Sequence, residues 1–97
     1  MKMLKKVKIG AHIYEVIYRD DMDDEDMGVC RPRKLKLFVD DTVAQSQKEE
    51  TFFHEVMHAI FNQTGLDKPL EDEKEEQMVQ ILGHAIYQVL KDNDLLK

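Results

Sequence analysis

The chain has 97 residues, of which 35% are charged, and a formal net charge of -6 at pH 7. A chain this short has room for one small core, so we expect residues 1–97 to form a single domain without a separate regulatory module. The acidic balance argues against nucleic acid as an obligatory partner, because binding phosphates needs a basic field. Cys30 is the only cysteine, which excludes an internal disulfide and a thiolate zinc cluster and favours a reducing cytoplasm. No stretch is long enough to span a bilayer, so we expect no membrane partner.

The first half of the chain, residues 1–41, predicts a small and mainly antiparallel sheet. Residues 7–19 are rich in β-branched and aromatic residues around a turn at Gly10-Ala11, which indicates a strand pair or one bent strand. Acidic residues from Asp20 to Asp26 repel one another and predict a solvated loop over 20–28. A short strand follows at 29–31. Leu35, Leu37 and Val39 then alternate with other residues, as is typical of a half-buried strand.

The second half changes to helical periodicity. Ser46 followed by Glu49 is a capping-box pattern, and Gly65 is a natural helix end, so a helix is predicted over 46–64. A second helix is predicted over 71–92, with an inner stripe of Val79, Leu82, Gly83, Ile86 and Leu90. The predicted fold class is therefore α+β, with a small sheet packed on two C-terminal helices.

Residues 54–58 read His-Glu-Val-Met-His, and this motif limits the chemistry of the chain more tightly than any other segment. Residues four apart on a helix project from nearly the same side, so His54 and His58 can offer two imidazole nitrogens to one metal ion. Glu55 lies beside that ion and can take a proton from a water that the metal activates. This arrangement is the core of zinc peptidases. The plainer interpretation is a pair of polar residues on an ordinary buried helix.

A catalytic zinc site normally has three protein ligands, so a third must come from elsewhere. The metzincin arrangement is excluded, because Phe61 and Thr64 occupy the positions where it requires glycine and a third histidine. The other common solution is a glutamate from the next helix. Helical phase favours Glu76, with Glu75 as the second choice, since they lie three and four residues before Val79 and so extend the inner stripe.

These residues carry a family resemblance. The motif of residues 54–58, followed by Glu76-Gln77-Met78-Val79-Gln80, resembles the gluzincin pattern of a histidine pair and a later helical glutamate. More narrowly, the chain is similar over most of its length to short metallopeptidases of bacteriophages and prophages, related to the minigluzincins and the ImmA/IrrE group. The resemblance implies Zn2+ as cofactor. It also implies that Gln80, where an acidic residue is common, hydrogen-bonds a zinc-bound histidine.

The resemblance further implies a zinc-dependent endopeptidase, active or latent, that hydrolyses an internal bond of a protein or peptide in the cytoplasm of a bacterial host. Kinship with the ImmA/IrrE group suggests a repressor-like regulator as substrate. A sheet strand beside the site would pair with the extended substrate, and residues 35–39 are predicted to be that strand. The alternative is a non-catalytic interaction protein of a mobile element, in which zinc staples two helices or the site is vestigial.

The residue that would stabilise the oxyanion is not evident from spacing. The candidates that could reach the cleft from the sheet or its loops are His12, Tyr14, Tyr18 and Arg33. Tyr87 lies about three helical turns beyond Glu76 and is predicted to belong to the core, whereas His84 is predicted to be an exposed polar residue.

Overall fold

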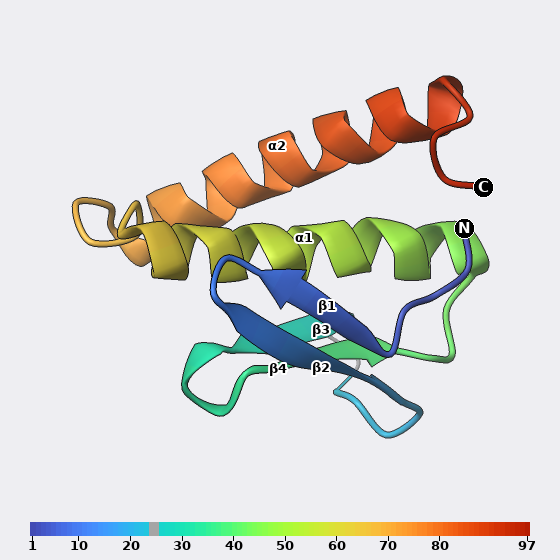
Figure 1. The fold of residues 1–97 in the computed structure, drawn as a ribbon, viewed down its shortest axis with the longest axis horizontal. Helices are drawn as coiled ribbons and strands as arrows, with labels where there is room; N and C mark the ends of the chain where they lie inside the picture. The colour runs from blue at the N-terminus through green and yellow to red at the C-terminus, as the bar shows by residue number, and fades with distance from the viewer. Residues whose placement is uncertain (24–25) are drawn as a thin grey trace.

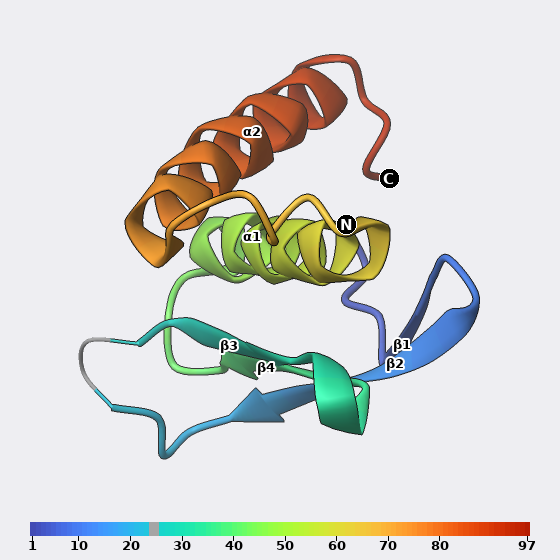
Figure 2. The same cartoon turned by 90° about the vertical axis from the view of Figure 1, so that its left-hand side faces the viewer.

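The computed structural model describes residues 1–23 and 26–97 and arranges them in three layers (Figures 1 and 2). Helix α1 is the middle layer: the sheet covers one side of it and α2 lies on the other. In chain order the elements are β1 (Lys6–Ile9), β2 (His12–Arg19), β3 (Gly28–Arg31), the 3-10 turn η1 (Pro32–Lys34), β4 (Lys36–Asp40), α1 (Gln45–Thr64) and α2 (Asp72–Asp92). The predicted α+β class is confirmed.

The sheet has the strand order β1-β2-β4-β3. The β1/β2 and β3/β4 pairings are antiparallel, as predicted, while β2 and β4 run parallel. The parallel pairing arises because the segment after β2 carries the chain to the far edge, where β3 forms, and β4 then inserts between them. That segment is the predicted acidic loop 20–28, of which residues 24 and 25 lie outside the described part and Gly28 already belongs to β3.

The alternation predicted for the last strand holds only within β4. Leu37 and Val39 are fully buried. Leu35 does not belong to the strand: it adopts a left-handed conformation, with φ of 53°, and its N–H bonds to the Pro32 carbonyl at the end of η1. The prediction for Leu35 was wrong because this residue ends the 3-10 turn η1, so the strand begins only after it.

One side of the sheet and one side of α1 form the core. Its buried members are Ile9, Tyr14, Val16, Leu37 and Val39 from the strands, with Phe52 and Ala59 from α1. Since His54 and His58 follow Phe52 by two and six residues, they project from a different side of α1. Packing against the sheet therefore fixes the direction in which the two histidines point.

Helix α1 begins one residue earlier than predicted, and its start is capped differently. The first cap residue is Ala44, whose N–H donates to Gln47 Oε1 over 3.0 Å. The predicted capping box of Ser46 and Glu49 was wrong, because Glu49 is buried and accepts a hydrogen bond from the Tyr87 hydroxyl instead. The predicted end is confirmed: Gly65 closes the helix with φ of 80°.

Helix α2 matches its predicted range to within one residue, but its inner stripe is narrower than predicted. The buried residues are Val79, Gly83 and Tyr87, each four apart, whereas Leu82 and Ile86 are 39% and 40% exposed. At Gly83 the α2 backbone comes close enough to α1 for an added Cβ to touch the His54 Cα at 3.4 Å. Such a close approach confines the contact with α1 to one narrow line. Neither α1 nor α2 is apolar enough along its length to cross a membrane.

Candidate metal centre

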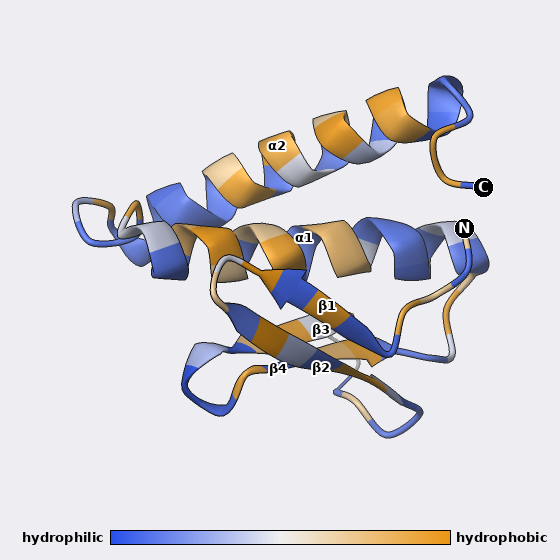
Figure 3. Ribbon diagram, viewed as in Figure 1, coloured by the Kyte–Doolittle hydropathy of each residue, from blue (hydrophilic) through white to orange (hydrophobic). Residues whose placement is uncertain are grey.

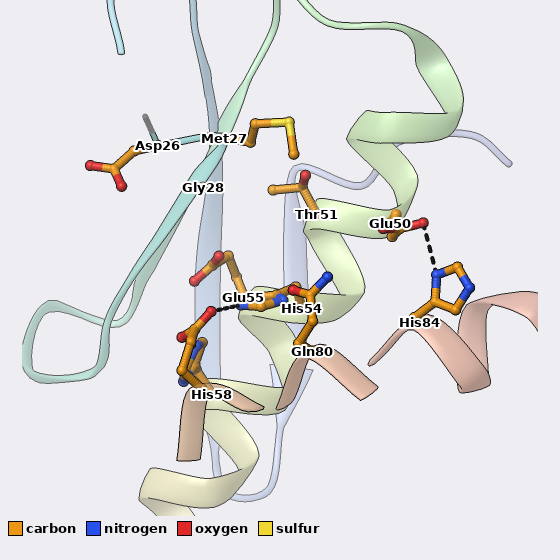
Figure 4. A pocket seen from close by; sticks show the side chains of 11 residues that line it. Asp26, Met27, Gly28, Glu50, Thr51, His54, Glu55, His58, Gln80 and His84 are labelled. Atoms are coloured by element: carbon orange, nitrogen blue, oxygen red, sulfur yellow. Dashed lines mark hydrogen bonds and ion pairs between the residues drawn. The ribbon is translucent and has the colours of Figure 1, made fainter. Parts of the chain in front are cut away.

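The two helices run antiparallel and place polar side chains along one flank of their contact (Figures 1 and 4). Because the helices are antiparallel, a step of four residues forward on α1 corresponds to a step of four back on α2. The flank therefore contains successive levels, each one helical turn apart. Glu50 contacts His84 at the first level and His58 contacts Glu76 at the last, and by the same spacing His54 and Gln80 share the level between them.

The predicted metal ligands converge at the last two of these levels. Glu76 bridges both histidines: Oε1 lies 2.8 Å from His54 Nε2, and Oε2 lies 2.8 Å from His58 Nε2. One ligand atom from each of the three residues falls within 4.8 Å of the others. The three residues that the sequence favoured as ligands thus form a single group.

The geometry and chemistry of this group suit a divalent transition metal. Ligand atoms about 2.1 Å from a tetrahedral zinc ion lie about 3.4 Å from one another, a value between the 2.8 Å contacts of Glu76 and the 4.8 Å limit of the whole group. Two imidazoles and one carboxylate are donors that Zn2+ accepts, as do other first-row transition metals. His54, His58 and Glu76 could therefore hold a metal ion with only small side-chain adjustments.

Glu75, the second choice as ligand, has a different place in the structure. Its Oε2 lies 2.6 Å from His58 Nδ1, on the side of the ring away from Glu76. A carboxylate at this nitrogen fixes the tautomer in which the other nitrogen is free to bind a metal. Gln80 lines the cavity beside His54 (Figure 4), yet among the described residues it hydrogen-bonds neither imidazole. The hydrogen bond to a candidate histidine ligand, predicted for Gln80, is thus made by Glu75, and the histidine is His58.

The side chain of Glu55 lies between α1 and β3 and is 6% exposed. A Cβ added at Gly28 would come within 2.9 Å of Glu55 Oε2 and 2.5 Å of Thr51 Cγ2. Only glycine therefore lets β3 approach the carboxylate this closely, a requirement that the sequence pattern did not reveal.

The electrostatic surroundings set the protonation of Glu55 and His58. Burial raises the pKa of Glu55 to about 7; His58 opposes this shift, while the charges of Glu76 and Asp26 add to it. Burial alone would lower the pKa of His58, but the hydrogen bond to Glu75 and the neighbouring charges of Glu55 and Glu76 raise it. A carboxyl group with a pKa near neutrality is suited to accept and return a proton.

A cavity of about 380 Å³ lies over these groups. Its lining includes Asp26, Met27 and Gly28 from the approach to β3 and its first residue, with Glu50, Thr51 and His84 from the helices. His84 is exposed as predicted, and its Nδ1 lies 3.2 Å from Glu50 Oε2 (Figure 4). The side chain of Glu76 is 58% exposed, so the ligand group opens to solvent.

The other residues predicted as candidates for the cleft do not line this cavity in the described part of the chain. Tyr14 is buried in the core, and the Tyr18 hydroxyl donates to the Leu4 carbonyl. His12 is exposed at the start of β2, and Arg33 belongs to η1. Tyr87 is buried, which confirms its prediction as a core residue.

The strand predicted to pair with a substrate, residues 35–39, is in the wrong place for that task. Strand β4 has β2 on one side and β3 on the other, so neighbouring strands already use its backbone groups. The strand at the edge of the sheet next to the cavity is β3. The error arose because strand order depends on pairings between distant segments, which alternation within one segment does not encode.

No family model, curated protein or solved structure matches this chain. What the site can do therefore has to be argued from its residues.

Proposed function

We propose that this protein is a zinc-dependent endopeptidase that cleaves an internal bond of a protein or peptide. The observation that carries the proposal is the convergence of His54, His58 and Glu76 within 4.8 Å, with the buried carboxylate of Glu55 in the same cavity. An ordinary polar helix surface does not require candidates for three ligands, a base and an orienting carboxylate to lie in one place, as they do here.

His54, His58 and Glu76 would hold the ion, and Glu75 would keep the His58 ring in the ligating tautomer. When bound, zinc would polarise the scissile carbonyl and lower the pKa of a water molecule. Glu55 accepts the proton of the attacking water on a carboxylate oxygen and returns it to the leaving amine nitrogen.

Strand β3 supports the preference for a polypeptide substrate. An extended peptide can add to the edge of a sheet through backbone hydrogen bonds, and β3 is the edge beside the cavity. The donors of the lining that remain for a developing oxyanion are Thr51, Gln80 and His84. A repressor-like regulator as substrate, and a bacteriophage context in a bacterial cytoplasm, belong to the same proposal and rest on the sequence resemblance alone.

The second candidate is a non-catalytic interaction protein in which a metal ion staples α1 to α2. One observation favours it: among the described residues, no tyrosine or arginine lines the cavity, so stabilisation of an oxyanion would depend on weaker or more exposed donors. In that case the ion would contribute to stability without turnover.

A peptide-library digestion followed by mass spectrometry separates the two candidates. The zinc-loaded wild type should cleave a subset of peptides, and Glu55→Gln should reduce cleavage about 100-fold or more while keeping its zinc. Glu73→Gln is the matched control, because Glu73 is exposed at the start of α2 and does not line the cavity. A wild type that binds zinc but cleaves nothing, or equal cleavage by Glu55→Gln, would favour the structural site.

A further inference from the structure

Helix α2 has an apolar side that the described fold does not cover. Five large residues on it are 39–61% exposed, with Ile81 at 61% and Val89 at 57%. They recur every three or four residues, together with the exposed Ala85, and form what we call the α2 outer stripe: Met78, Ile81, Leu82, Ala85, Ile86 and Val89. Figure 3 shows apolar residues along α2, which is the outermost layer of the molecule. Such a stripe is typical of a helix that packs on another helix.

The apolar area that the outer stripe exposes is large enough for the centre of a protein–protein interface. The outer stripe leaves roughly 400–500 Å² of apolar surface in contact with water, which is within the range of about 300–600 Å² for the largest, often functional, patch on a typical monomer. A stable homodimer buries about 800 Å² on each partner, of which the apolar core is a part and the polar rim the remainder. The stripe thus has the size of the apolar core of a small dimer interface.

The charges beside the stripe favour a second copy in one orientation. Lys74 and Asp92 are both exposed and lie 18 residues apart, which is five full helical turns, so they flank the stripe on the same side at its two ends. Two α2 helices can pack antiparallel through their stripes, with the two-fold axis at the level of Gly83 along the helix. Lys74 of each copy then lies within one turn of Asp92 of the other. The same axis places Met78 close to Val89 of the other copy, and Ile81 at the level of Ala85.

A parallel arrangement is disfavoured by the first turn of α2. Asp72, Glu73 and Glu75 lie there, so parallel packing would bring two acidic helix ends together. The antiparallel arrangement keeps the two acidic first turns apart, at opposite ends of the contact. Isologous contacts of this kind close on themselves and do not propagate into fibres.

We propose that two copies of this chain associate through the α2 outer stripe, antiparallel, with reciprocal Lys74–Asp92 ion pairs at the two ends. Gln80 and His84 lie on a different side of α2 from the stripe, so association leaves the metal-site cavity open in both copies. The inference does not depend on the proposed peptidase activity.

Sedimentation velocity of the full chain from about 1 µM to about 500 µM tests the association, because this range spans the dissociation constants expected for a small interface. The wild type should shift from a mass of 11.4 kDa to twice that mass as concentration rises. Ile81→Glu should raise the dissociation constant about 100-fold or more, since it places a charge in the centre of the contact. The matched control is Ile13→Glu, because Ile13 is 60% exposed on β2 and should leave association unchanged.

A charge exchange tests the orientation. Lys74→Asp should weaken association about threefold to tenfold, and the double variant Lys74→Asp/Asp92→Lys should restore it. Circular dichroism of each variant establishes that the fold is retained. A wild type that stays monomeric over the whole range would overturn the proposal. So would a dimer that Ile81→Glu leaves intact, or one that the charge exchange fails to restore.

Discussion

Two adjacent glutamates contact the two nitrogens of one histidine ring. Glu75 reaches His58 Nδ1 and Glu76 reaches His58 Nε2, although consecutive residues on a helix point about 100° apart. Helical phase alone left both residues open as ligands because each is close to the inner side of α2. Only the position of the ring of His58 relative to α2 separates their roles.

At the other end of the helix pair, Glu49 is a buried carboxylate with several partners. It is 5% exposed and accepts hydrogen bonds from Tyr87 over 2.9 Å and from Gln45 over 3.0 Å. The amino group of Met1 lies 3.1 Å from it. Burial alone would raise the pKa of Glu49, but these hydrogen bonds and the nearby positive charge lower it below its ordinary value.

The lowered pKa predicts a pH-dependent contribution to stability. A carboxylate with a depressed folded-state pKa stabilises the fold above its unfolded value of 4.5, and this stabilisation is lost as pH falls through the folded-state pKa. Glu49→Gln should therefore lower the free energy of unfolding at pH 7 by about 1–3 kcal/mol, and the difference should shrink below about pH 4.5. Urea unfolding across this pH range measures it, with the adjacent Glu50→Gln as control. A difference that stays constant with pH would contradict the assignment.

The helices were easier to predict from the sequence than the sheet, because the signals that begin and end a helix are local. The ends of α1 and α2 follow from local signals such as Gly65, and the metal motif needs only helical spacing to bring His54 and His58 together. The inner stripe of α2 was predicted less well. Leu82 and Ile86 are apolar at helical spacing, but the close approach at Gly83 narrows the contact and leaves them at its flank.

Gly83 lies where α2 contacts the α1 backbone, so two substitutions there should separate the effects of side-chain size. An alanine Cβ would lie 3.4 Å from His54 Cα, an ordinary contact, so Gly83→Ala should change the free energy of unfolding by no more than about 1 kcal/mol. Gly83→Val adds methyl groups where the α1 backbone lies, so it should destabilise by about 1–3 kcal/mol. It should also move Glu76 away from the histidines and weaken zinc binding. Thermal unfolding and a zinc-chelator competition measure the two effects, and a Gly83→Val variant with wild-type zinc affinity would contradict this account.

In the whole molecule, the order of the layers determines which side chains come together at the candidate metal site. Helix α1 packs on the sheet through Phe52 and Ala59 and presents His54 and His58 toward α2. The sequence predicted a small sheet packed on two helices, since the periodicity of each half is local, but not that α1 would lie between the sheet and α2. It did not predict that β4 inserts between β2 and β3, because that arrangement depends on pairings between residues far apart in the chain. The same insertion makes β3 the edge strand beside the cavity.

We propose that α1 and α2 together hold one metal ion through His54, His58 and Glu76. The direct measurement is metal content by inductively coupled plasma mass spectrometry after zinc loading and dialysis, on the wild type, Glu76→Ala and Glu75→Ala. We expect about one zinc per chain in the wild type and little in Glu76→Ala, with Glu75→Ala binding zinc about 10–100-fold more weakly. A wild type that retains no zinc, or a Glu76→Ala variant that retains as much as the wild type, would contradict it.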